Sequence, residues 1–437
     1  MIKLGRSFWW VIFLLIASFL LSRIPNLSGN PIYLRLFILF LLILLTSGLW
    51  TILSVLHLEV IRTTRVNRKP VGEVFSENFE VINRSIIPKV WLKISDQSDL
   101  PGGAGSRVLT FIGGKQTRAY IAHSYLMQRG WFQLGPTQIS TGDFFGLFLA
   151  KKEFPGEDML LVLPHMVSIR EFPAPFGILP GGRALRQKTL EVTPYAAGVR
   201  EFVQGDPLKS IHWPSSARKQ RLMVKEFEKD PLAEVWIFVD MQRSVHYSAV
   251  DEDDARPQEI NWLIQKQPFR LPPETEEYAI SIGASLANYY IQQKREVGLI
   301  AAGQKYAVLP AERGERQLGK ILETLAVLRA EGDLPLSGLI STQIVHLTRG
   351  STIIMISPSA DQKIFTVAVD LIQRGLKPVV ILIDQASFGG GQSSEDLRTL
   401  LVNHGVLIFT VRNGDNLKSV LESPGLLLTN QPFFRNQ

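Results

Sequence analysis

Two long apolar runs lie near the start of the chain. Residues 8–22 and residues 36–56 carry no charged side chain, and most of their side chains are bulky and apolar. A helix needs about 20 such residues to cross a hydrocarbon core of about 30 Å. The pattern predicts a membrane segment over residues 1–58 with two transmembrane helices, at about 8–22 and 34–56.

The first apolar run has the length of a signal peptide as well as that of a short helix. A signal peptide ends in a small-x-small cleavage site, and residues 20–25 offer none, so we favour an uncleaved helix. Basic residues flank the outer ends of the two helices at Lys3, Arg6, Arg62, Arg65, Arg68 and Lys69, against Arg23 and Arg35 near the connecting turn. This asymmetry predicts a multi-pass protein of the cell (inner) membrane with its N- and C-termini in the cytoplasm.

Between residues 59 and 165 the pattern changes to short alternating stretches. Residues 77–83 and 89–95 alternate apolar and polar side chains, and loops rich in glycine separate such stretches at 101–106 and 112–115. A period of two is typical of strands with one buried face. Strands at this spacing predict an immunoglobulin-like β-sandwich over residues 59–165.

The last part of the chain, residues 233–437, alternates apolar strands with helices. The expected strands are 234–240, 297–301, 352–357, 378–384 and 406–411, and the expected helices are 274–293, 313–329, 361–374 and 394–404. Such alternation predicts a doubly wound, mostly parallel sheet, so the fold class is α/β plus β. Residues 166–232 lack this periodicity and read as a linker followed by a polar and aromatic joint.

The amino-acid composition excludes several kinds of site and partner. The chain has no cysteine, which excludes disulfides, thiolate metal sites and cysteine nucleophiles. Its formal net charge of +7 is small for 437 residues, so we expect no nucleic-acid partner and regard the lipid bilayer as the partner of the juxtamembrane basic residues. A basic stretch over residues 183–225 fits a solvated face or lipid headgroups better than nucleic acid. Gly389 to Gly391 precede Gln392 rather than Lys, so this run is no P-loop.

Several motifs then resemble a known family. One reads Arg129-Gly130-Trp131-Phe132, Leu134-Gly135-Pro136 and Thr141-Gly142-Asp143-Phe144-Phe145-Gly146-Leu147-Phe148; the other reads Arg200-Glu201-Phe202, Gly205-Asp206-Pro207, Ile211-His212-Trp213 and Ala217-Arg218. They are similar to the signature of the domain-of-unknown-function-58 (DUF58) family. The resemblance implies a von Willebrand factor A-like domain over residues 233–437. It also implies a partner of the MoxR-type AAA+ ATPase class, and hence an adaptor or assembly role.

The resemblance also implies where a metal could bind. Von Willebrand factor A-like domains hold Mg²⁺ with an Asp-x-Ser-x-Ser turn at a strand end, because this ion prefers hard oxygen ligands. Asp240 and Ser244 match the turn, but Gln242 replaces one hydroxyl and Arg243 adds positive charge. We therefore expect no cofactor, with Mg²⁺ at a degenerate site as the alternative; without a metal, Asp240 would merely cap the turn.

The segment between the two large domains has two interpretations. Asp206, His212 and Ser215 or Ser216 could form a hydrolytic trio, because acyl transfer uses a hydroxyl beside a base and a carboxylate. The chain contains no Gly-x-Ser-x-Gly elbow, which argues against this interpretation. The other is a buried structural joint with Trp213 packed inside, formed by Arg200, Gly205, Asp206, His212, Trp213 and Arg218.

The joint is the interpretation we favour. The absence of a catalytic set then leads to a hypothesis about function. The protein is expected to be a non-enzymatic, membrane-anchored cytoplasmic interaction or adaptor module that works with a MoxR-type AAA+ ATPase. The alternative is a hydrolase acting on envelope material, with its site around Asp206, His212 and Ser216. A solvent-open cleft at these residues would favour the enzyme, and burial would favour the joint.

Overall fold

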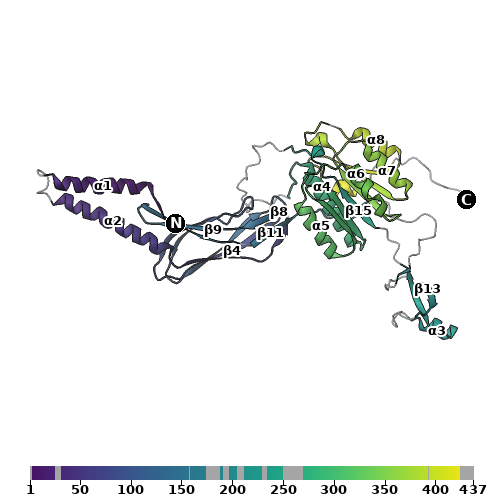
Figure 1. Cartoon of the computed structure of the whole chain (residues 1–437), viewed down its shortest axis with the longest axis horizontal. Coiled ribbons are helices and arrows are strands. Elements are labelled where there is room, and N and C mark those ends of the chain that lie inside the picture. The colour runs from purple at the N-terminus through teal and green to yellow at the C-terminus, as the bar shows by residue number, and fades with distance from the viewer. Residues whose placement is uncertain are drawn as a thin grey trace. The chain divides into compact units, whose positions relative to one another are not determined.

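The computed structural model of the chain is drawn in Figure 1. It describes residues 2–24, 31–156, 158–173, 188–189, 196–203, 211–228, 234–249, 269–391 and 393–423. The chain divides into two compact units. Unit 1 comprises Met1–Pro164 with Glu252–Arg270, and unit 2 comprises His165–Asp251 with Leu271–Gln437.

Unit 1 begins with two helices, α1 (Arg6–Arg23) and α2 (Ile32–Val55). By length and composition both could cross a membrane. They run antiparallel and side by side, with the rings of Phe19 and Phe37 5.3 Å apart between centroids. The two predicted helices are therefore confirmed as helices, with bounds shifted by one or two residues.

The strands of unit 1 form three sheets. The five-stranded sheet has the order β1-β10-β9-β5-β6, and the other two have the orders β2-β4-β7 and β3-β11-β8. The strands are β1 (Ile2–Leu4), β2 (Leu58–Thr64), β3 (Arg68–Pro70), β4 (Val74–Asn83), β5 (Lys89–Asp96), β6 (Arg107–Ile112), β7 (Thr117–Tyr125), β8 (Gly130–Leu134), β9 (Thr137–Gly142), β10 (Phe148–Phe154) and β11 (Asp158–Leu163). Neighbouring strands are antiparallel except for β3 and β11.

Alternation places one face of each strand in a shared core. Phe79 and Val81 of β4 pack in one cluster with Leu92 and Ile94 of β5, so the β2-β4-β7 sheet and the five-stranded sheet face each other. A second cluster, which includes Phe75, joins the start of β4 to the β3-β11-β8 sheet. Unit 1 is thus a β-sandwich that carries the two helices.

The helices are fixed to the sandwich at both of their attached ends. Strand β1 precedes α1 and pairs with β10, with Lys3 opposite Leu149. At the end of α2, the buried Lys89 donates hydrogen bonds from Nζ to the carbonyl oxygens of Leu53 and Leu56, at 2.5 and 3.3 Å. Carbonyl groups at a helix C-terminus have no hydrogen-bond donor within the helix. The ammonium group of Lys89 supplies that donor here.

Unit 2 contains a six-stranded sheet of order β17-β16-β15-β18-β19-β20, parallel except for the edge strand β17. Its strands are β15 (Val235–Val239), β16 (Val297–Ala302), β17 (Tyr306–Glu312), β18 (Thr352–Ser357), β19 (Lys377–Ile383) and β20 (Leu407–Val411). The helices are α4 (Thr275–Gln292), α5 (Glu315–Val327), α6 (Leu336–Gln343), α7 (Lys363–Gln373), α8 (Glu395–Asn403) and α9 (Leu417–Glu422). The predicted strands and helices of this unit are all present; β17, α6 and α9 are additions.

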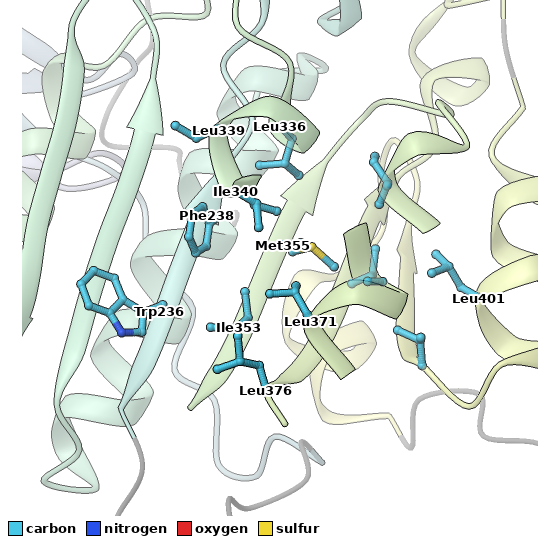
Figure 2. Close-up of a cluster of buried hydrophobic side chains, with 14 of the residues drawn as sticks. Trp236, Phe238, Leu336, Leu339, Ile340, Ile353, Met355, Leu371, Leu376 and Leu401 are labelled. Atoms are coloured by element: carbon cyan, nitrogen blue, oxygen red, sulfur yellow. The ribbon is translucent and has the colours of Figure 1, made fainter. Parts of the chain in front are cut away.

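Helices cover both faces of this sheet, because its central strands are apolar on both sides. Trp236 and Phe238 of β15 pack against α6, α7 and α8 in one buried cluster, part of which Figure 2 shows. On the other face, a Cβ at Gly283 of α4 would lie 3.4 Å from Val239 and 3.7 Å from Ile356, so α4 lies close against the sheet.

A small sheet of order β12-β14-β13 lies in the region predicted to be a joint. Its strands are β12 (Lys188–Thr189), β13 (Ala196–Glu201) and β14 (Met223–Glu228), and the short helix α3 (Trp213–Lys219) lies between β13 and β14 in the chain. The motif residues that the structure describes here, among them Arg200 in β13 and Trp213 and Arg218 in α3, therefore belong to a strand and a helix.

Candidate functional site

The carboxyl edge of the parallel sheet carries several polar side chains. Asp240 follows β15, Ser357 ends β18 and Asp384 follows β19, on strands that are neighbours in the sheet. In open α/β folds this edge is where ligands bind, because the loops after parallel strands meet there.

Asp240 is buried, at 1% exposure, and both of its carboxylate oxygens accept hydrogen bonds. Oδ2 accepts from Ser357 Oγ at 2.6 Å, and Oδ1 accepts from the Gln242 amide at 3.1 Å. Burial raises the pKa of Asp240 above its ordinary value of 3.8, and these two hydrogen bonds together with the charge of His246 oppose the rise. The proton on this group is therefore held to a higher pH than on an exposed aspartate.

His246 extends this polar cluster toward helix α4. Its Nε2 lies 2.9 Å from the Asp240 carbonyl oxygen, and its Nδ1 lies 3.1 Å from Thr275 Oγ1. A carbonyl can only accept, so Nε2 carries a proton and donates. Sequence reasoning missed both residues, because they are 6 and 35 positions from Asp240 (246 − 240 and 275 − 240) and belong to no motif that names them.

The residues of the Asp240 turn fit a Mg²⁺ ion poorly. Arg243 and Ser244 are exposed and lie in a short 3₁₀ turn, while Gln242 occupies the first hydroxyl position. Both oxygens of Asp240 already face protein donors, and no group of three or more His, Cys, Asp or Glu side chains among the described residues could hold a metal ion. The turn-cap interpretation describes this geometry; metal binding by Asp240 and Ser244 stays untested.

The family-motif helix α3 begins with a side-chain cap. His212 Nδ1 accepts a hydrogen bond from the Ser215 amide at 3.3 Å and lies 2.7 Å from Ser215 Oγ. A nitrogen that accepts from a backbone N–H carries no proton, so the Ser215 hydroxyl donates to it. His212 thus supplies the acceptor that a helix N-terminus requires.

Ser216 connects α3 to β14. It is buried, its Oγ donates to the His212 carbonyl at 3.0 Å, and the same Oγ accepts from the Met223 amide at 2.8 Å. These contacts are structural, since they hold the helix to its neighbouring strand and leave the hydroxyl inside.

Trp213 is exposed, and this corrects the expectation that it is packed in a buried joint. Its exposed fraction is 66%, and Arg218 and Lys219 of the same helix are exposed too. Ser216 is the buried residue of α3, so the helix contacts its neighbouring strand there, and Trp213 at the first helical position stays outside that contact. The structure thus brings His212, Ser215 and Ser216 together but leaves Trp213 and Arg218 on the surface.

The structure describes less of the other residues that were predicted to form the joint. Arg200 lies in β13, where its backbone pairs with Val224, and Gly205 and Asp206 fall outside the described residues. The hydrolytic trio and the place of Gly205 and Asp206 in a joint therefore stay predictions.

Comparison with known proteins supports the family resemblance. Residues 198–259, which include α3, match the family model described as "Protein of unknown function DUF58". The chain is also similar to the "Uncharacterized protein YeaD" of Bacillus subtilis (strain 168), with 21% identity over 339 residues that cover 75% of this chain and 77% of that protein. The chain thus combines a β-sandwich unit and an α/β unit with a segment that matches the DUF58 family model.

Solved structures add no argument about the fold. The complex of zinc 2-glycoprotein and prolactin-inducible protein from human seminal plasma matches with a TM-score of 0.19 and 10% identity, over 24% of this chain and 92% of that one. An exo β-N-acetylglucosaminidase from Vibrio harveyi matches with a TM-score of 0.17 and 8% identity, over 75% of this chain and 57% of that one. Both scores are too low for a structural conclusion.

Proposed function

We propose that the protein is a membrane-anchored cytoplasmic interaction module that binds a protein partner through α3, and that this partner is a MoxR-type AAA+ ATPase. The observation that carries the proposal is the 66% exposure of Trp213 inside the matched family segment. Tryptophan and arginine are the residues most enriched at the energetic centres of protein interfaces. Trp213 and Arg218 lie on one short helix, with Lys219 beside them.

The polar chemistry of α3 supports binding rather than catalysis. The imidazole of His212 caps the helix, and the Ser216 hydroxyl is buried between His212 and Met223. The 2.7 Å contact between His212 and Ser215 is the observation that favours the alternative, a hydrolase acting on envelope material. Helix capping accounts for the same contact without a reaction.

We also propose finer assignments for the two units. The order β17-β16-β15-β18-β19-β20 with an antiparallel edge strand and helices on both faces supports a von Willebrand factor A-like domain. The facing antiparallel sheets of unit 1 support an immunoglobulin-like sandwich.

We also propose a topology for the anchor, and strand β1 supports it. Because β1 pairs with β10 of the sandwich, the residue before α1 and the residues after α2 belong to one folded unit. Two helices that leave this unit and return to it form a hairpin whose outer ends lie on one side of the bilayer. The basic residues at those ends support the proposal that this side is the cytoplasm.

A binding experiment with matched variants tests the proposal. The full chain is purified in detergent, immobilised, and incubated with a MoxR-type AAA+ ATPase from the same organism. We expect Trp213→Ala and Arg218→Glu each to weaken binding by tenfold or more, as interface centres do. Trp131→Ala, at an exposed tryptophan on β8, serves as the control and should leave binding unchanged. Absence of binding by the unmodified chain, or equal binding by Trp213→Ala, would refute the proposal.

A further inference from the structure

Three loops of the sandwich lie at the end where the two apolar helices attach. Strand β2 begins at Leu58, directly after α2, and pairs with Asn83, so the β4–β5 loop that follows Asn83 lies there. Ile82 pairs with Thr117, which brings the β6–β7 turn to the same end. The β9–β10 loop joins them, because the Gly5 amide at the start of α1 donates to the Leu147 carbonyl at 2.7 Å.

The β9–β10 loop, residues 143–147, has a defined shape. The buried Asp143 accepts hydrogen bonds from the amides of Phe145 and Phe148, at 2.8 and 2.7 Å. Gly146 has a φ of +69°, which a residue with a side chain rarely adopts. A carboxylate and a glycine therefore hold the loop so that its two central side chains point outward.

Those two side chains are large and apolar. Phe144 and Phe145 are 66% and 60% exposed, which is unusual for neighbouring phenylalanines on a rigid turn. Ile86 on the β4–β5 loop and Phe111 at the end of β6 are exposed as well. Exposed apolar side chains thus line the end of the sandwich nearest the helices. We call this set the apolar tips; it comprises Ile86, Phe111, Phe144 and Phe145.

The apolar tips are continuous with the surface of the two helices. The ring of Phe144 lies 5.3 Å from Trp50 of α2, and Phe148 lies 5.4 Å from Phe8 of α1, measured between centroids. Trp9 and Trp10, in the first turn of α1, are exposed at this same end. Aromatic residues gather in this way where a protein crosses the boundary between headgroups and acyl chains.

We propose that the β9–β10 loop is a second membrane contact, in which Phe144 and Phe145 insert into the headgroup and acyl boundary of the bilayer that α1 and α2 cross. This inference rests on the proposed membrane anchoring. The depth follows from Trp50, which lies five residues before the end of α2 at Val55 and so about 7.5 Å inside it, at 1.5 Å per residue. A ring in contact with Trp50 lies at that depth, within the 5–10 Å that interfacial segments reach.

The insertion would give Asp143 a function beyond the turn, because Asp143 shapes the loop that would attach the sandwich to the bilayer at a third point. With α1, α2 and the loop all in the bilayer, the sandwich is held at three points and cannot swing freely on its hairpin. The partner-binding unit would then be carried on a sandwich of fixed orientation to the membrane.

Single-cysteine labels test the inference directly, because the chain has no cysteine of its own. Phe145→Cys is labelled with an environment-sensitive fluorophore in the full chain, reconstituted in nanodiscs of phosphatidylcholine with a minority of phosphatidylglycerol. Gln97→Cys is the control. Gln97 directly follows β5, whose eight residues span about 26 Å from Lys89, the residue that contacts the end of α2. Leu41→Cys in α2 reports whether the hairpin itself is inserted.

We expect the label at 145 to be quenched by lipids with brominated acyl chains and shielded from aqueous iodide, and the label at 97 to behave in the opposite way. If the label at 41 is quenched by brominated lipid but the label at 145 responds only to iodide, the loop inference is wrong and the anchor stands. A label at 145 shielded from both quenchers would indicate a protein partner and also overturn the inference. If the label at 41 escapes brominated lipid, the membrane anchoring proposed above fails.

Discussion

At the scale of single residues, the most informative side chains are Trp213 and Asp240. A motif tryptophan next to a histidine suggests packing, yet Trp213 is exposed, because α3 packs through Ser216 instead. Asp240 is a carboxylate at the strand end, as the sequence predicts, but its partners Ser357 and His246 come from positions that no spacing rule connects to it. The kind of side chain at each site could be predicted from the sequence, whereas the direction in which that side chain points depends on the fold around it.

Trp213→Ala is expected to leave stability nearly unchanged, within about 0.5 kcal/mol, because an exposed side chain loses little on truncation. Trp236→Ala is the matched comparison, since Trp236 is buried in the core of the α/β unit. Removing a core aromatic costs about 3–5 kcal/mol. Denaturant unfolding of the full chain in detergent measures both. A large loss for Trp213→Ala would restore the buried-joint interpretation.

Asp240→Asn is expected to change how stability depends on pH. Because the folded pKa of Asp240 is raised above the value of 3.8, its contribution to stability is fully present below that pH and is lost as pH rises through the folded pKa. The asparagine variant lacks this dependence, so the unmodified chain should gain stability relative to the variant as pH falls. Melting temperatures over a pH series measure it, with the exposed Asp333→Asn as control. Parallel curves for the chain and for Asp240→Asn would show that the carboxyl is not perturbed.

At the scale of elements, the sequence predicts most helices and strands of the α/β unit within one or two residues. Strong periodicity explains this success. The edge strand β17 escaped prediction because an edge strand buries little, and α6 escaped because it is short and contains Gly338. The β1–β10 pairing also escaped, since three residues before an apolar helix carry no strand signal.

Lys89→Ala is expected to loosen the junction between α2 and the sandwich. The variant leaves the Leu53 and Leu56 carbonyls without the lysine that donates to them, at a cost of about 1–3 kcal/mol. Lys93→Ala, at an exposed position of the same strand, is the control. Hydrogen exchange should accelerate over residues 53–60 in Lys89→Ala and stay unchanged in Lys93→Ala. Equal hydrogen-exchange rates in the two variants would show that the hydrogen bonds of Lys89 do not stabilise the junction between α2 and the sandwich.

At the scale of the whole molecule, the chain divides into two folded units. The two apolar helices and the sandwich share one folded unit, and the α/β sheet with the family-motif helix belongs to the other. The fold class could be predicted from the periodicity and length of the apolar segments, because these patterns depend on many residues at once. A partner could not be predicted in this way, since in the proposed function its recognition depends on a few exposed side chains of α3.

The central claim is that α3 binds a protein partner at Trp213, and site-specific photocrosslinking in living cells tests it most directly. A photoreactive amino acid replaces Trp213 in one strain and the exposed Trp131 in a matched strain. The account predicts a covalent adduct between position 213 and a MoxR-type AAA+ ATPase, identified by mass spectrometry, and no such adduct from position 131. An ATPase adduct from both positions, or from neither, would contradict it.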